Sequence, residues 1–129
     1  MKEPAIKVIA KPRDTNPHGD MFGGWIVSMM DLAGAIAARK VTRTNIVTVA
    51  IDNIIFHNPV FVGDCLECFT EVEKVGRTSI TIKVEAYVER KDRTSDDEKV
   101  KVTEGKFIFV AIDENRRPTA IAKKNIPNS

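Results

Sequence analysis

Asp31 is the first side chain of this sequence whose type and position suggest chemistry. It lies within a run of apolar residues, and its neighbours three and four positions away on a helix are small or apolar: Val27, Ser28, Gly34 and Ala35. A carboxylate in such surroundings is costly without partners. Carboxylates of this kind gather at functional sites, but a helix face that reaches solvent, or a bond to a buried backbone group, accounts for Asp31 equally well.

The loop before this apolar run is the second candidate. Residues 14–25 read DTNPHGDMFGGW, so that Gly23 and Gly24 stand directly before the expected helix. Free backbone N–H groups at the positive end of a helix can hold an anion or a developing oxyanion. Read alone, however, two glycines in this position indicate a plain tight turn more often than a binding site.

One helix must position Asp31. The pattern predicts it from Trp25 to about Lys40, because the segment is rich in good helix formers and ends with two cations, which suit a helix C-terminus. The segment is also apolar nearly all round, which is typical of a helix buried in a core. The region from Pro12 to Gly24 is rich in proline and glycine and predicts a loop.

The other elements are predicted to be strands. Residues 79–89 alternate most clearly, and residues 75–78 (VGRT) predict a hairpin turn before them. The expected strands cover residues 5–10, 46–56, 65–74, 79–89 and 99–112. One face of the fourth strand carries Ile80, Ile82, Val84, Ala86 and Val88. Residues 91–98 predict a charged loop, and residues 125–129 a frayed tail.

These elements predict an α+β fold, in which one buried helix packs against an antiparallel sheet of about five strands. A curved sheet covers such a helix on most sides but still leaves an edge. An uncovered edge strand invites pairing with another chain, so a dimer formed by continuing the sheet is expected.

Length and composition limit the function. The chain has 129 residues, of which 43% are hydrophobic and 29% charged, with a net charge of +2. A single domain over residues 1–129 is expected. The near-neutral charge argues against a nucleic-acid partner, and no apolar run approaches the length of a membrane span. Without a secretory signal or a disulfide framework, a cytoplasmic protein is expected.

Several ordered motifs together resemble a known family. They are NxxGDxFGGW at residues 16–25, MD at 30–31, GA at 34–35, FHNPVFVGD at 56–64 and VGRTS at 75–79. In this order and spacing they resemble the hotdog-fold acyl-CoA thioesterases of the YciA type, from about Ile6 to about Pro118. The resemblance implies one long helix wrapped by an antiparallel sheet that continues into a partner's sheet.

The resemblance also implies roles for individual residues. Asp31 matches the catalytic acid on the family's helix, and Asn16 matches its active-site asparagine. Gly23 matches the glycine whose backbone N–H polarises the thioester carbonyl, and Gly24 is assigned to substrate binding. The implied reaction hydrolyses acyl-CoA to a free acid and CoA, with Asp31 acting either as a general base on water or as a nucleophile. No metal or other cofactor is expected.

Helix geometry adds a constraint to this assignment. Gly23 and Asp31 are eight residues apart, or about 12 Å along a helix. An oxyanion donor and an attacking group must both lie about 3 Å from one reacting centre. We therefore expect Asn16 and Gly23 of one subunit to meet Asp31 of the other, so that a homodimer is the minimal active unit. The resemblance further implies a homohexamer, built as a trimer of dimers.

The turn at Gly76, Arg77, Thr78 and Ser79 is the candidate clamp for CoA. Free N–H groups, hydroxyls and an arginine suit a phosphate, although without the family resemblance a polar hairpin turn is the better interpretation.

The remaining candidates are weaker. Cys65 and Cys68 have metal-site or redox spacing, but a three-residue offset on a strand points them to opposite faces. His57 could act in acid–base chemistry, yet it is better interpreted as a polar surface residue at a strand end. His18, in the loop before the helix, could contact substrate but is not selected.

Two other functions stay open. A dehydratase-like enzyme on acyl thioesters would need a catalytic histidine where Phe22 stands, which counts against it. A non-enzymatic domain that binds or senses acyl-CoA would keep Arg77 but would not need Asp31 and Asn16 together.

Overall fold

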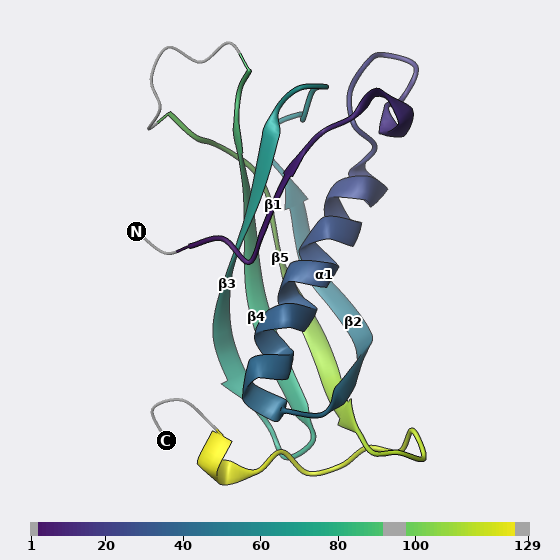
Figure 1. Ribbon diagram of the computed structural model, residues 1–129, viewed down its shortest axis with the longest axis vertical. Coiled ribbons are helices and arrows are strands. Elements are labelled where there is room, and N and C mark those ends of the chain that lie inside the picture. The colour runs from purple at the N-terminus through teal and green to yellow at the C-terminus, as the bar shows by residue number, and fades with distance from the viewer. Residues whose placement is uncertain (1–2, 92–97, 126–129) are drawn as a thin grey trace.

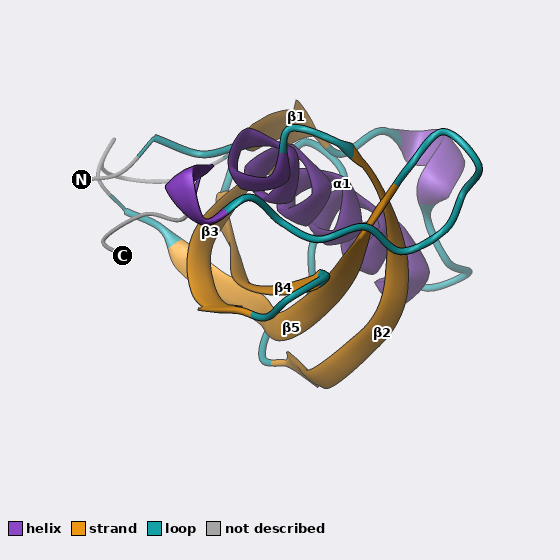
Figure 2. Cartoon of the chain, turned by 90° about the horizontal axis from the view of Figure 1, so that it is seen from below, coloured by secondary structure: helices purple, strands orange, loops and turns teal. Residues whose placement is uncertain are grey.

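The computed structural model describes residues 3–91 and 98–125. One long helix lies against a five-stranded antiparallel sheet that curls around it (Figures 1 and 2). The strands are β1 (Ile6–Ile9), β2 (Asn45–Phe56), β3 (Cys65–Val75), β4 (Ser79–Glu89) and β5 (Val100–Ile112), and the helix is α1 (Gly23–Thr42). Short 3-10 turns are formed by Pro12–Asp14 and Lys123–Asn125. The predicted α+β architecture is confirmed.

The sheet places the strands in the order β1-β3-β4-β5-β2, and every neighbouring pair is antiparallel. The alternation predicted for β4 is confirmed, because all five apolar side chains of its inner face are fully buried: Ile80, Ile82, Val84, Ala86 and Val88. Helix α1 closes the core with one face, and Met30 and Ala33 are fully buried there.

Helix α1 is two residues longer at each end than the sequence predicts. At the start, Gly23 and Gly24 are helical instead of forming a turn. At the end, the β-branched Val41 and Thr42 continue the helix because both are buried, so that packing overrides their weak helix preference. The helix ends at Arg43, which is left-handed with φ of 56° and donates its N–H to the carbonyl of Arg39.

Close packing of α1 on the sheet depends on Gly34. A Cβ atom at that position would lie 3.1 Å from the ring of Phe109 and 3.5 Å from Val84. The glycine therefore lets the helix approach β4 and β5 closely, which fixes the height of Asp31 above the sheet.

Strand β2 forms one edge of the sheet and is the longer of the two edge strands. It exposes large apolar side chains: Val49, Ile51, Ile55 and Phe56. Leu32 and Ile36 of α1 are exposed as well. The sheet therefore covers only one side of the helix within a single chain, and an apolar surface continues from α1 onto β2.

Two predicted segments lie mainly outside the described residues. Of the charged loop, residues 92–97 are not described, and of the tail, residues 126–129 are not described. Within the described parts, no helix is long and apolar enough to cross a membrane.

Candidate active site

Asn16 shapes the loop that precedes α1. Its side-chain Oδ1 accepts hydrogen bonds from the backbone N–H groups of His18 (2.9 Å) and Asp20 (3.0 Å), and its own N–H donates to the carbonyl of Asp20 at 2.6 Å. Gly19, with φ of 90°, allows the tight reversal. Within the described residues no partner is recorded for the Asn16 side-chain N–H₂ group, so both of its protons are free to bind a ligand.

The first turn of α1 supplies a second set of donors. Phe22 caps the helix without a side-chain bond, and its carbonyl accepts the N–H groups of Trp25 and Ile26. The N–H groups of Gly23 and Gly24 come before these and have no recorded acceptor in the described chain. They carry the positive end of the helix dipole, as the sequence predicts.

The space around the backbone differs between Gly23 and Gly24. A Cβ at Gly23 would lie 3.1 Å from the ring of Phe56, whereas around Gly24 there is nothing within 4 Å. Phe56, at the end of β2, therefore packs directly on the backbone of Gly23, and the backbone of Gly24 is open to an approaching group.

A cavity of about 380 Å³ joins these features. Its walls come from the loop before α1, from the start of α1 and from the segment after β2. They are formed by Asn16, Asp20, Met21, Gly23, Ile26, Phe56, His57, Asn58, Pro59 and Val60. The structure thus brings Asn16 and Gly23 together, whereas Asp31 is not among the residues that line this cavity.

Asp31 instead points to the edge strand. Thr48 of β2 donates its hydroxyl to Asp31 Oδ1 at 2.8 Å. The bond fixes one carboxylate oxygen and holds the side chain over β2. Sequence reasoning missed Thr48, since it lies 17 residues from Asp31 and only the curl of the sheet brings the two together.

His57 forms part of the cavity wall and is tied to β5. Its Nε2 lies 2.8 Å from Glu104 Oε1, and the same oxygen lies 3.0 Å from Lys101 Nζ. The bond to His57, followed by that to Lys101, lowers the pKa of Glu104. His57 is exposed, as its interpretation as a polar surface residue predicts, but that interpretation did not include its place in the cavity wall.

An ion pair holds the outer wall of the cavity. Asp64 is buried, and its Oδ2 accepts from Arg90 Nη1 at 2.5 Å and from the N–H of Phe61 at 2.8 Å. Arg90 also donates to the carbonyl of Pro59 at 2.9 Å. These bonds fix the segment between β2 and β3 to the end of β4. A separate bond, from the N–H of Met21 to the carbonyl of Val60, joins the segment to the loop before α1.

The turn proposed as a CoA clamp lies far from this cavity within one chain. Residues 76–79 join β3 to β4 at the end of the molecule where α1 stops, opposite to the end where it starts (Figure 1). The N–H of Gly76 donates to the carbonyl of Ser79 at 2.8 Å, and the carbonyls of Arg77 and Thr78 accept from Ile121 and Ala111. The turn is therefore well braced, but the structure does not bring it to Asn16 and Gly23.

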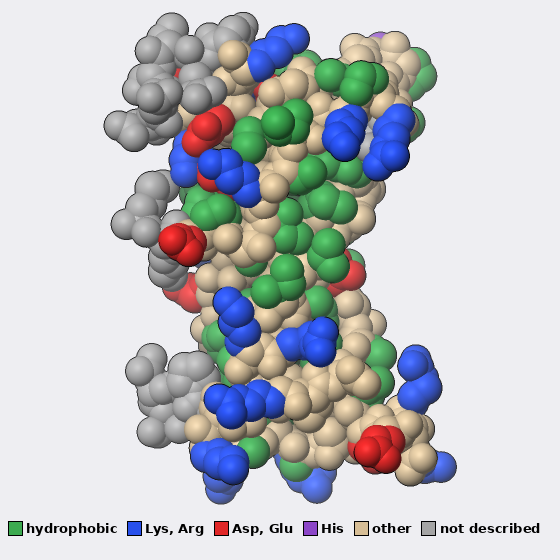
Figure 3. Space-filling view, in the orientation of Figure 1, with side chains coloured by type: hydrophobic (Ala, Val, Ile, Leu, Met, Phe, Trp, Pro, Cys, Tyr) green, Lys and Arg blue, Asp and Glu red, His purple; other side chains and the backbone are tan. Residues whose placement is uncertain are grey.

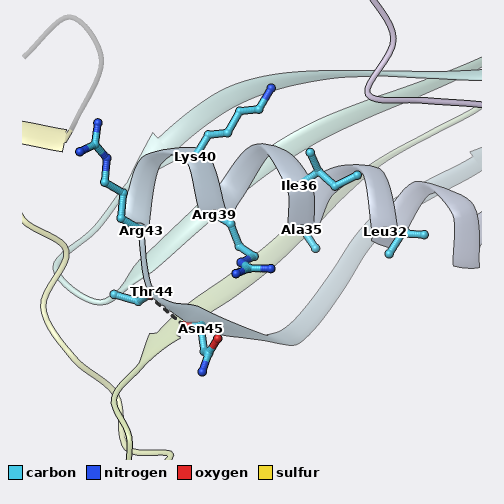
Figure 4. A pocket seen from close by; sticks show the side chains of 8 residues that line it. All are labelled: Leu32, Ala35, Ile36, Arg39, Lys40, Arg43, Thr44 and Asn45. Carbon is cyan, nitrogen blue, oxygen red and sulfur yellow. Dashed lines mark hydrogen bonds between the residues drawn. The ribbon is translucent and has the colours of Figure 1, made fainter.

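A cationic groove of about 570 Å³ lies at the end of α1 and the start of β2. It combines apolar and basic side chains: Leu32, Ala35, Ile36, Arg39, Lys40, Arg43, Thr44 and Asn45. Figure 4 shows Arg39 on the side of Asn45, while Lys40 and Arg43 point away from it. Hydrophobic side chains run along the middle of the face shown in Figure 3, and lysines and arginines lie towards both its upper and its lower end.

Neither Cys65 nor Cys68 is part of a disulfide. Burial raises the pKa of the Cys68 thiol to about 12, which makes it a poor nucleophile or metal ligand. Among the residues that the structure describes, no three His, Cys, Asp or Glu side chains are grouped to hold a metal ion.

A long helix packed against a curled five-stranded antiparallel sheet is the hotdog arrangement. The chain belongs to the thioesterase superfamily, whose family model matches residues 18–94.

Named relatives agree with this family. An uncharacterized acyl-CoA thioester hydrolase of Haemophilus influenzae is 43% identical over 120 residues, covering 93% of this chain and 78% of that protein. The acyl-CoA thioester hydrolase YciA of Escherichia coli K12 is 37% identical over 116 residues, covering 90% and 88%.

Two solved structures are also similar to the fold of this chain. A hexameric hotdog fold thioesterase of Campylobacter jejuni matches with a TM-score of 0.90 at 40% identity, over 96% of this chain and 93% of that one. A hexameric broad specificity acyl-coenzyme A thioesterase matches with a TM-score of 0.87 at 42% identity, over 97% and 84%.

Proposed function

We propose that the protein is an acyl-CoA thioesterase, which hydrolyses acyl-CoA to a free carboxylic acid and CoA. The observation that carries the proposal is the cavity in which the Asn16 amide and the unpaired N–H of Gly23 meet. Relatives at 37% to 43% identity that carry the name acyl-CoA thioester hydrolase support the substrate class.

The active site is shared between two subunits. Asp31 and Gly23 lie about 12 Å apart along α1, and Asp31 is hydrogen-bonded to Thr48 of β2, an edge strand of the sheet. A second copy that pairs its own β2 with this edge would cover the exposed apolar surface of β2 and α1. The homodimer is thus the minimal active unit of the proposal.

Twofold pairing of β2 gives a register that completes the site. Thr48 and Phe56 lie at equal distances from Asp52 along β2. Antiparallel pairing about an axis near Asp52 sets Thr48 opposite Phe56 of the partner subunit. Because Thr48 holds Asp31 and Phe56 packs on Gly23, each carboxylate then meets the cavity of the other subunit.

The chemistry follows from these positions. The thioester carbonyl oxygen accepts the N–H of Gly23, which stabilises the negative charge as the carbonyl carbon is attacked. The Asn16 amide orients the water or the carbonyl. Asp31 of the partner subunit either takes a proton from the attacking water or attacks the carbonyl itself and forms an anhydride that water then cleaves. The proposal uses neither a metal nor an organic cofactor.

The nucleotide part of CoA is assigned to the turn of Gly76, Arg77, Thr78 and Ser79, together with the open backbone of Gly24. Because this turn lies far from the Asn16 and Gly23 cavity of its own chain, we propose that the turn of another subunit binds the nucleotide. A homohexamer supplies such neighbours, and the hexameric assembly of two similar thioesterases supports it. Cysteines that form no disulfide are in keeping with the cytoplasmic location that we propose.

Release of free thiol from a panel of acyl-CoAs tests the function. We expect hydrolysis by the wild type and a loss of kcat of at least about a hundredfold in Asp31→Ala and Asp31→Asn. Glu114→Gln, in the exposed turn after β5, is the control and should keep full activity. Acyl-CoA binding without thiol release would identify a binding domain instead, and hydration of an unsaturated acyl-CoA would identify a dehydratase-like enzyme.

A further inference from the structure

His57 occupies a place in the cavity that the proposed mechanism has not used. It lines the same 380 Å³ space as Asn16 and Gly23. The backbone N–H of His57 donates to the carbonyl of Val102 at 2.7 Å, which anchors the residue to β5 directly after β2 ends. The backbone of His57 is therefore fixed at the wall of the cavity that Gly23 also lines.

Glu104 sets the orientation of this ring. The Nε2 atom of His57 lies 2.8 Å from Glu104 Oε1. Bonds from His57 and Lys101 lower the pKa of Glu104, so the carboxyl is ionised and can only accept. Nε2 must then carry the proton of this bond, and Nδ1 is left as the nitrogen that can exchange a proton with a ligand. No bond to Nδ1 is recorded within the described residues.

The charges around His57 come from three elements. Glu104 and Lys101 lie on β5, and Glu85 on β4 binds Lys101 at 2.7 Å. Asp20, from the loop before α1, lines the same cavity. Lys101 is thus shared by two carboxylates, and one of them, Glu104, remains directed at the imidazole. A carboxylate behind an imidazole orients the ring.

We propose that His57 is a further catalytic residue, which donates a proton from Nδ1 to the sulfur of CoA as the thioester bond breaks. The inference rests on the proposed thioesterase function. The C–S bond breaks with its electron pair passing to sulfur, and the sulfur takes the Nδ1 proton of the imidazolium. The proton of the attacking water goes through Asp31 of the partner subunit to solvent, and solvent returns a proton to His57. The overall reaction is therefore acyl-CoA plus water to the carboxylic acid plus CoA.

Kinetics of His57→Gln test the step. A general acid contributes about a hundredfold, so we expect kcat to fall by about that factor while KM stays within about twofold. Because the imidazolium is the active form, wild-type kcat/KM should decline at high pH, where an imidazole is neutral, and the variant should lack this alkaline limb. Glu104→Gln should lower kcat while keeping the limb, because the ring loses its orientation, and Glu114→Gln, in the exposed turn after β5, should behave as the wild type.

Nuclear magnetic resonance of the side chains gives a readout that does not depend on turnover. The chain has two histidines, so His18→Gln leaves His57 as the one signal. We expect the neutral ring to carry its proton on Nε2 and the Nδ1 resonance to shift when CoA is added. An unchanged kcat in His57→Gln, a change in KM alone, or an alkaline limb that persists in the variant would each overturn the role of His57. A wild type that hydrolyses no acyl-CoA would overturn the proposed function as well.

Discussion

At the scale of single residues, the bond between Thr48 and Asp31 makes the clearest prediction. A hydrogen bond to a charged group is worth about 1.5 to 3 kcal/mol, and the Thr48 hydroxyl fixes one oxygen of the proposed catalytic carboxylate at 2.8 Å. Thr48→Ala should therefore lower kcat about tenfold, because the carboxylate loses its orientation, and should leave KM nearly unchanged.

Thr48→Ser keeps the hydroxyl and is the matched control, with kcat expected close to that of the wild type. Both constants follow from the thiol-release assay on purified protein, and circular dichroism confirms that each variant folds. A Thr48→Ala variant with full kcat would show that the hydroxyl only braces β2 against α1.

The residues differ in how far the sequence could predict them. Asp31 is noticeable by itself, because a carboxylate within an apolar helix requires an explanation. Asn16 and Gly23 were assigned through the order of motifs, and the structure supports their pairing by placing both at one cavity. Thr48 and His57 could not be placed, since their partners Asp31 and Glu104 are distant in sequence and meet only across strands.

At the scale of elements, strand β2 connects the proposed site to the assembly. Thr48, Ile51 and Phe56 pair with Phe109, Phe107 and Thr103 of β5, all of which are buried, so the three β2 side chains face the helix side of the sheet. Ile51 is nevertheless 41% exposed, because α1 leaves this part of the sheet uncovered. A partner's α1 and β2 would fill that space.

Ile51→Lys should therefore prevent dimer formation, because it buries an unpaired charge between the subunits. We expect monomers in analytical ultracentrifugation and a loss of thioesterase activity of about a hundredfold or more. Ile51→Leu keeps the volume and polarity and should retain both assembly and activity. A fully active Ile51→Lys monomer would rule out the shared site.

The sequence predicts the elements better than their ends or their exposure. The period-2 pattern of β4 is read directly, because one face is fully buried. The sequence predicts the start of α1 two residues too late, because glycine disfavours a helix interior, whereas Gly23 and Gly24 are helical in the structure. The all-apolar helix surface was interpreted as burial within one chain, whereas Leu32 and Ile36 are exposed in it.

At the scale of the whole molecule, one chain holds the parts of the proposed site at separate places along α1. The Asn16 and Gly23 cavity lies at its start, Asp31 leans on β2, and the turn of Gly76 to Ser79 lies at its far end. In the part of the chain that the structure describes, these groups are spread along the length of α1. Their separation is the reason that the proposal includes a second subunit.

Mixing inactive subunits tests this arrangement directly. Asn16→Ala and Asp31→Ala homodimers each lack one half of both sites, but a mixed dimer regains one intact site from Asn16 of one chain and Asp31 of the other. Since half of randomly formed dimers are mixed and one of their two sites works, we expect about a quarter of wild-type activity after joint refolding.

The matched control places both substitutions in one chain and mixes it with the wild type in equal amounts. If each site is shared, mixed dimers contain no intact site, and only the wild-type homodimers act, which leaves about a quarter of the activity of an equal amount of all-wild-type protein. If each chain holds its own complete site, every wild-type chain stays active and about half remains. A shared site therefore predicts two results. The mixture of the two single variants regains activity, and the mixture of the double variant with the wild type loses more activity than the dilution of wild-type chains explains.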